Sequence, residues 1–393
     1  MGFSCVGHTA SHLFAPIFYV TVLALEGELG LSHGETVSLI IVGNLLFGFA
    51  APLAGWLGDR WSSVGMMGIF FVGTGISMIM VGASDSPFAI GLWLAATGLF
   101  ASIYHPVGIA WLVRISVKTG TVLGINGIFG GLGPALAALM TGALIDFFSW
   151  RAAFAVPGAL VLATGLLFYG LVARGWIFET KGDRKPPPTP PSRSDTIRVI
   201  GVLAFTMVCS GVIYNATQPA LPKAFAIDFG AGGGAGILGV SALVALVYTV
   251  SGLMQAFGGR MADIYPPRRV YLFCYFLQIP FLLLAGMVAG SPLVAVAIVM
   301  VCLNTSALPA ENLLIARYTP QHRRALVYGL KFVLAIGVAS LGVLLEGRIF
   351  DATGGFMWLF VVLAAFALAA AAAVFGLPVD RDSRVAAAAG AAE

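Results

Sequence analysis

The stretch Gly55-Trp-Leu-Gly-Asp59 ends one long apolar segment, and Gly259-Arg-Met-Ala-Asp263 ends another in the same way. Their first residues stand 204 positions apart. Two further pairs recur at offsets of 205 and 203 residues: Gly142-Ala-Leu-Ile-Asp146 with Gly347-Arg-Ile-Phe-Asp351, and Pro16 with Pro219. Three pairs of landmarks at one near-constant offset predict a chain built from two repeated halves.

The composition around these landmarks indicates a membrane protein. Of the 393 residues, 59% are hydrophobic and only 10% are charged, whereas soluble domains are about 45–50% apolar and about 25% charged. A soluble fold of this length could not cover so much apolar surface, so we expect a lipid bilayer around the chain. The spacing of the four cysteines is neither that of a disulfide framework nor that of a zinc site; they are Cys5, Cys209, Cys274 and Cys302. We therefore expect neither a metal nor a cofactor.

Apolar segments long enough to cross a bilayer, about 20 residues each, follow one another along the chain. The sequence thus predicts an all-α membrane protein with twelve transmembrane helices in two pseudo-symmetric six-helix bundles. The predicted spans are 2–25, 36–57, 65–83, 87–113, 121–145, 152–173, 199–226, 235–258, 270–289, 292–316, 325–347 and 355–377. Internal repeats of this kind are typical of transporters, with the solute site between the repeats.

The basic residues predict the orientation. With both termini in the cytoplasm, only Arg151, Lys223 and Arg348 of the 21 Lys and Arg residues fall outside, and Lys331 falls within a span. The positive-inside rule therefore favours this topology in the cytoplasmic (inner) membrane and explains the net charge of +4 without a nucleic-acid partner. We expect an N-terminal bundle over 1–174, a proline-rich basic linker over 175–198, a C-terminal bundle over 199–378 and a disordered tail over 379–393.

The loop after the second span, Gly55-Trp-Leu57-Gly-Asp59-Arg60, resembles the conserved loop of the major facilitator superfamily, and the resemblance covers nearly the whole chain. It implies that family's fold. It also implies that Asp59 and Arg60 help to close an inner gate, and the same role follows for their second-half counterparts, Asp263, Arg268 and Arg269.

A glycine-rich stretch in the fifth span resembles the glycine–proline motif of the family's antiporters. Small residues let helices approach closely and proline bends them, so we expect helix packing at Gly127, Gly130, Gly131, Gly133 and Pro134. Two other stretches resemble the fosmidomycin-resistance-type exporters of this superfamily: Ser11-His12-Leu13 and Tyr104-His105-Pro106.

Polar residues within the predicted spans mark a candidate solute and proton path, because ionisable groups in a membrane are costly and usually face a cavity or one another. Those in this chain are on spans one, four, ten and eleven, and in the family fold spans one, four, seven and ten line the cavity. Glu311 and Lys331 lie at similar depth in adjacent spans, and we hypothesise that they form an ion pair. The candidates are His8, His12, Asn44, Tyr104, His105, Asn126, Tyr214, Asn215, Gln218, Asn304, Glu311 and Lys331.

These features predict a transporter and not an enzyme, since no nucleophile set or nucleotide-binding motif is present. One hypothesis is a proton-coupled antiporter that exports a small organic solute. The alternative is a proton symporter or facilitator that imports a small polar or anionic nutrient. A receptor on the same scaffold would not need titratable groups along a cavity. The expected partners are the small-molecule substrate, protons and lipid, and we expect a monomer.

Overall fold

The computed structural model describes residues 1–114, 119–178, 192–230, 236–319 and 324–378, and within these ranges the regular structure is helical. Most of the predicted linker and the whole predicted tail lie outside the described residues. The loop 231–235 also lies outside them.

The first half begins with a span made of two helices, and its second span is made of three. Its elements are α1 (Gly2–Ser11), α2 (Phe14–Leu29), α3 (His33–Ser38), α4 (Ile41–Phe49), α5 (Ala51–Arg60), α6 (Ser63–Gly82), α7 (Pro87–Ala101), η1 (Tyr104–Gly108), α8 (Ile109–Arg114), α9 (Thr119–Phe147) and α10 (Trp150–Ala173).

The second half begins with the longest helix and contains a span broken into four pieces. Its elements are α11 (Arg193–Phe225), η2 (Ala226–Gly230), α13 (Gly236–Ile264), α14 (Pro267–Ala285), α15 (Ser291–Tyr318), α16 (Arg324–Phe332), η4 (Val333–Gly337), η5 (Val338–Ser340), α17 (Leu341–Thr353) and α18 (Met357–Val374).

The number of spans agrees with the prediction. Within the described ranges, 11 helices are long and apolar enough to cross a membrane, and His33–Phe49 with Ala51–Arg60 forms one more span bent by 41°. The bend falls at Ala50, just before Pro52, where the proline ring prevents the regular helix from continuing. The predicted twelve-helix architecture is therefore confirmed.

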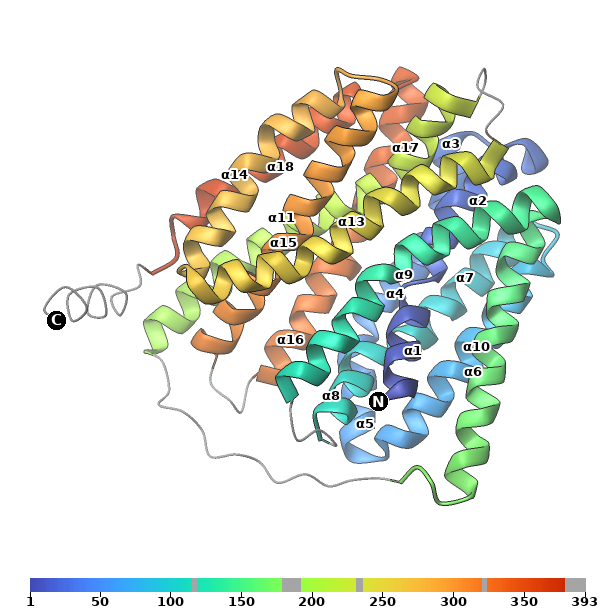
Figure 1. Cartoon of the computed structure of the whole chain (residues 1–393), viewed down its shortest axis with the longest axis horizontal. Coiled ribbons are helices and arrows are strands. Elements are labelled where there is room, and N and C mark those ends of the chain that lie inside the picture. Colours follow the sequence, from blue (N-terminus) through green and yellow to red (C-terminus); the bar gives the residue numbers. More distant parts are fainter. Residues whose placement is uncertain (115–118, 179–191, 231–235, 320–323, 379–393) are drawn as a thin grey trace, which may run out of the picture.

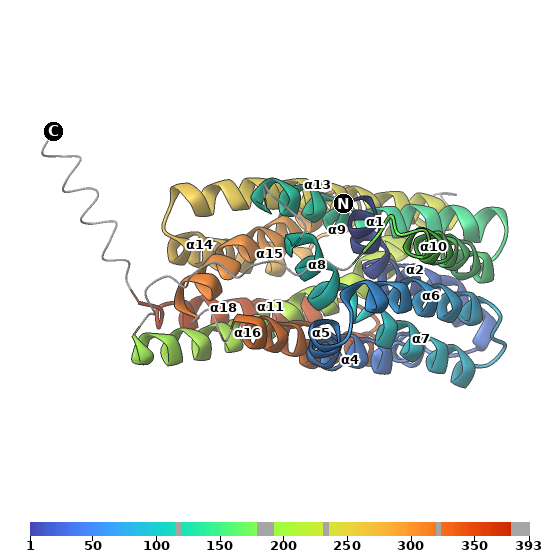
Figure 2. The ribbon, with the colours of Figure 1, turned by 90° about the horizontal axis from the view of Figure 1, so that it is seen from below.

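The halves lie side by side, as the colours in Figure 1 and the view from below in Figure 2 show. The helices α9 and α13 run along each other between them. Additional contacts join α2 to α11, α3 to α17 and α4 to η4. The interface between the halves thus runs the length of the bundle.

Breaks in the helices fall where polar residues enter the membrane interior. The first span is interrupted at His12 and Leu13. The fourth contains the π-helical turn η1, where Pro106 lacks the donor that a regular helix needs. The eleventh contains η4 and η5. Single π-helical turns within α-helices are frequent at functional sites, so the breaks direct attention to these spans.

A repeated packing contact supports the internal duplication. In the first half, Gly55 of α5 lies against Pro106 of η1, and in the second half Gly259 of α13 lies against Pro309 of α15. The glycines are 204 positions apart and the prolines 203. The two halves therefore place the same two residue types in contact at equivalent positions.

Candidate functional site

Three histidines from the first half converge at the breaks in spans one and four. His8 lies on α1, His12 follows α1 directly, and His105 lies in η1. Their ring centroids are 5.3 Å apart for His8 and His12, 5.4 Å for His8 and His105, and 5.0 Å for His12 and His105. The structure thus brings together three of the predicted cavity residues, which we call the histidine cluster.

The ring of His8 is held from two sides. Its Nδ1 lies 2.8 Å from the backbone oxygen of Asn126, which only accepts, so Nδ1–H is the donor. The ring also stacks on Tyr104, with centroids 5.1 Å apart. Tyr104 in turn donates to the backbone oxygen of Ser4 at 2.7 Å and accepts from the Asn126 amide at 2.9 Å. This neutral network fixes the position and tautomer of His8.

The glycine-rich face of α9 makes room for the cluster. A Cβ on Gly130 would overlap the His8 ring, and one on Gly133 would lie 2.8 Å from the Cβ of His12. Gly131 faces Gly252 of α13 and so lets the two halves approach closely. A Cβ on Gly127 would meet nothing within 4 Å, and the packing role of this glycine stays a prediction. Pro134 lies buried inside α9.

The second half places an ion pair in its polar centre. Lys331 Nζ on α16 lies 2.7 Å from Glu311 Oε1 on α15, which confirms the hypothesised pair. Tyr271 donates to the other carboxylate oxygen at 2.8 Å, and Lys331 also donates to Asn312 at 2.7 Å. Glu311 is only 1% exposed, so its charge depends on these partners.

One aromatic contact joins the two centres. The ring of His105 stacks on Phe332, with centroids 4.8 Å apart. Phe332 ends α16 and is the chain neighbour of Lys331. Phe332 therefore connects the two centres across the interface between the halves.

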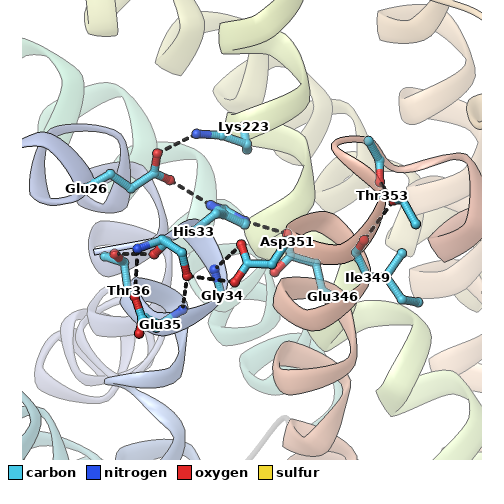
Figure 3. Close-up of polar contacts among 12 residues, drawn as sticks. Glu26, His33, Gly34, Glu35, Thr36, Lys223, Glu346, Ile349, Asp351 and Thr353 are labelled. Atoms are coloured by element: carbon cyan, nitrogen blue, oxygen red, sulfur yellow. Dashed lines mark hydrogen bonds and ion pairs between the residues drawn. The ribbon is translucent and has the colours of Figure 1, made fainter. Parts of the chain in front are cut away.

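A second polar network, which sequence reasoning missed, joins the halves at the end of the bundle where α3 and α17 lie; Figure 3 shows it, and we call this the latch end. His33 bonds through Nδ1 to Glu26 and through Nε2 to Glu346, each at 2.7 Å. Lys223 pairs with the other oxygen of Glu26. Since Glu346 and Lys223 belong to the second half, these contacts tie the halves together.

The latch end also contains a reciprocal pair of helix caps. Asp351 of the second half accepts from Ser32 Oγ at 2.7 Å and from the Gly34 amide at 3.0 Å, at the start of α3. Asp146 of the first half accepts from the amides of Ile237 and Leu238 at 3.2 and 2.8 Å, at the start of α13. A carboxylate is favoured at the positive end of a helix. These aspartates end the repeated Gly-x-x-x-Asp stretches, so the repeat itself was the signal that could have found them.

Comparison with known proteins identifies the superfamily. The chain matches the Major Facilitator Superfamily over residues 5–201 and 203–392. It belongs to this superfamily. The predicted superfamily is thus confirmed, and the resemblance to the fosmidomycin-resistance-type exporters remains a prediction.

Individual relatives within the superfamily are distant. A probable hexose phosphate transport protein of Chlamydia pneumoniae is 27% identical over 167 residues, which cover 41% of this chain and 36% of that protein. The puromycin resistance protein pur8 of Streptomyces alboniger is 24% identical over 135 residues, which cover 34% and 27%. The chain thus aligns with about a third of the length of the curated relatives it matches.

Solved structures of the superfamily share the whole fold. The nucleoside transporter NupG superposes with a TM-score of 0.75 at 14% identity, covering 95% of this chain and 98% of that one. A bacterial homologue of the human lysosomal transporter Spinster, in an inward-facing and unoccupied conformation, gives 0.72 at 14% identity, covering 95% and 93%. At these identities the likeness shows the fold alone.

The residues predicted to act in the superfamily's gating loops lie at the end opposite the latch end. Asp59 pairs with Arg114 at 3.1 Å, and Arg60 lies over the Trp56 ring at 5.9 Å. Arg268 donates to the last carbonyls of α18, a favourable place for a cation. Asp263 and Arg269 are exposed. Their role in gating stays a prediction.

The remaining predicted cavity residues are dispersed along the interior of the superfamily fold. Asn44 donates to Tyr19 at 2.9 Å, and Asn304 to Ser210 at 3.3 Å. Asn215 donates to its own helix at Gly211.

Two others lie near the interface between the halves. Tyr214 packs edge-on against Tyr248 at 6.4 Å. Gln218 lines a small cavity with Pro16, Tyr19 and Tyr248. The two matched landmark prolines lie in the same region, since Pro219 follows Gln218 directly. The structure does not bring these residues into one site with the histidine cluster.

Proposed function

We propose that this major facilitator protein exports a small organic solute in exchange for protons, by alternating access between the two halves. The observation that carries the proposal is the buried ion pair Glu311–Lys331, linked through Phe332 to the histidine cluster of the other half. Through Lys331 and its chain neighbour Phe332, the Glu311 carboxylate is connected to His105 of the first half.

The chemistry of the pair supports exchange. A proton that binds Glu311 removes the charge that Lys331 and Tyr271 satisfy, and a solute that binds at the pair competes for the same groups. Two ligands that compete for one site, presented alternately to each side, are carried in opposite directions. The glycine–proline face of α9, which resembles the superfamily's antiporters, and the similarity to a puromycin resistance protein favour export.

A second candidate is the import of an anionic solute with protons. The observation that favours it is the similarity to probable hexose phosphate transport proteins. Lys331 and the histidine cluster are also groups that can bind a negative charge. Here a proton on Glu311 would release Lys331 to bind the anion, so that both ligands move together.

Proton flux distinguishes the two directions. The purified protein is placed in liposomes with a pH-sensitive dye inside, and puromycin, nucleosides and hexose phosphates are offered in turn as a solute gradient. Exchange moves protons against the solute, whereas co-transport moves them with it. We expect exchange, and we expect Glu311→Gln to abolish it.

The matched control is Asp228→Asn. It also removes one carboxylate charge, but Asp228 is exposed, accepts from the Gly290 amide and does not contact the Glu311–Lys331 pair. It should retain exchange. Solute uptake with no proton movement in the unchanged protein, or full coupling in Glu311→Gln, would contradict the proposal.

The latch end supports a specific part of alternating access. With the basic residues at the opposite end in the cytoplasm, the latch end faces outward, and Asp351 and Asp146 hold the outer side closed. Removing the negative charge beside a helix N-terminus costs about 0.3–1 kcal/mol, and about 1.4 kcal/mol is a tenfold change in a conformational equilibrium.

We therefore expect Asp351→Asn to increase the outward-open population by several-fold. Spin labels at Phe148→Cys and Met287→Cys, both exposed at the latch end, report the separation of the halves as a distance distribution. Asp85→Asn is the control, because Asp85 pairs with Arg151 at the same end but within one half. An equal shift in both variants would contradict the latch role.

A further inference from the structure

The histidine cluster has the geometry of a metal site, although the cysteine spacing gave no reason to expect one. One ring nitrogen from each of His8, His12 and His105 can be chosen so that all three lie within 4.8 Å of one another. His8 and His12 stand four residues apart, with His12 directly after the end of α1, and this is the spacing with which two histidines of one helix bind zinc. His105 completes the set from η1.

The hydrogen bonds leave the correct nitrogens free. His8 donates from Nδ1 to the Asn126 carbonyl, so its Nε2 keeps the lone pair that a metal requires. A backbone carbonyl that accepts from the second nitrogen is the usual support for a metal-binding histidine. His105 is 8% exposed, and its Nε2 has no hydrogen-bond partner among the residues that the structure describes. An unpartnered buried nitrogen beside two other imidazoles indicates a missing ligand.

The ring nitrogens are close enough together to converge on one ion. Zinc binds histidine nitrogens at about 2.0–2.1 Å, so tetrahedral ligand nitrogens lie about 3.4 Å apart. Small side-chain rotations suffice to reach this spacing from at most 4.8 Å. Gly130 and Gly133 of α9 let His8 and His12 lie directly against that helix, where a Cβ would crowd them.

We propose that His8, His12 and His105 form a binding site for one divalent transition-metal ion, with Zn²⁺ the best-suited ion and a fourth coordination position left for water or a solute. Three imidazoles without a carboxylate select zinc, copper or nickel over magnesium and calcium, which prefer oxygen ligands. The proposal does not depend on the direction of transport or on proton coupling, because it rests on the geometry of α1 and η1.

Direct binding to the full-length protein tests the site. The protein is purified in detergent without a polyhistidine tag and titrated with Zn²⁺ by calorimetry, and with Co²⁺ by visible absorption, which reports tetrahedral coordination. We expect one ion per chain. His12→Gln and His105→Gln should each weaken binding by about 100-fold or more, since loss of mere supporting groups costs about 10–100-fold.

Three further variants make the result specific. His33→Gln and His322→Gln remove the two other histidines of the chain and should leave binding unchanged. Gly130→Ala keeps every ligand but places a Cβ against the His8 ring, so it should weaken binding while the protein stays folded and monodisperse. The proposal is overturned if the unchanged protein binds no stoichiometric Zn²⁺, or if folded His12→Gln and His105→Gln variants bind as well as it does.

Discussion

The polar centres of the two halves are built on the same scaffold but carry different chemistry. In the first half Gly55 packs on Pro106, and in the second Gly259 packs on Pro309. Beside Pro106 stand three imidazoles and a tyrosine, and the hydrogen bonds of His8 and Tyr104 go to neutral backbone oxygens. Close to Pro309 stands the ion pair of Glu311.

The difference can be traced to single positions. Gly108 and Glu311 are 203 residues apart, the offset that also relates Pro106 to Pro309. A Cβ at Gly108 would lie 2.7 Å from the Tyr104 ring, so the first half has no space there for a carboxylate. Duplication therefore explains the framework, and local packing decides which half holds a charge.

The largest expected effect comes from breaking the ion pair on one side only. Lys331→Met leaves Glu311 buried and without its cation, and breaking a buried pair in this way costs about 3–5 kcal/mol. We expect a clear fall in the thermal midpoint of unfolding in detergent, measured by the change in tryptophan and tyrosine fluorescence on heating. The corresponding loss of one imidazole, His12→Gln, should cost much less because it leaves no unpaired charge.

A double variant isolates the pair. Lys331→Met combined with Glu311→Gln should recover most of the stability that Lys331→Met loses, since no lone charge then remains. If the loss of stability in the double variant equals the sum of the losses in the two single variants, the Glu311–Lys331 pair does not stabilise the second half.

The contrast also shows what the sequence could reveal. The spans, the duplication and the Glu311–Lys331 pair follow from apolar length, constant offset and equal depth in adjacent helices. Span length and depth depend on the distance along one helix, which is about 1.5 Å per residue, and the duplication depends on the sequence offset alone.

Contacts between distant segments could not be derived in the same way. The four-residue spacing of His8 and His12 predicts one helix face, but their meeting with His105 depends on the break at His12 and on the π-helical turn η1. Gly130 and Gly133 lie against α1 and the residue that follows it, and the sequence could not specify that the side chains they meet there are His8 and His12. The latch residues Glu26, His33 and Glu346 lie near span ends, where a position in sequence does not specify a partner.

A smaller effect compares the same substitution in both centres. Tyr271 donates to the charged Glu311, whereas Tyr104 donates to the neutral backbone oxygen of Ser4. Hydrogen bonds to charged groups are worth about 1.5–3 kcal/mol and neutral ones about 0.5–1.5 kcal/mol. Tyr271→Phe should thus lower the thermal midpoint more than Tyr104→Phe. An equal or reversed order would show that the carboxylate does not depend on Tyr271.

The smallest effect tests whether the shared scaffold is as tight in both halves. A Cβ at Gly55 would lie 3.1 Å from the Cβ of Pro106, but one at Gly259 would lie 4.0 Å from that of Pro309. Alanine stabilises a helix by roughly 0.5–1 kcal/mol relative to glycine where it fits, so Gly259→Ala should raise the thermal midpoint slightly. Gly55→Ala should lose that gain, because the Pro106 ring in η1 must shift to admit the methyl group and it adjoins His105. Equal shifts of the thermal midpoint in the two variants would mean that η1 adjusts to the added methyl group as easily as α15 does. The first half would then be packed no more tightly around its histidines than the second half is around its ion pair.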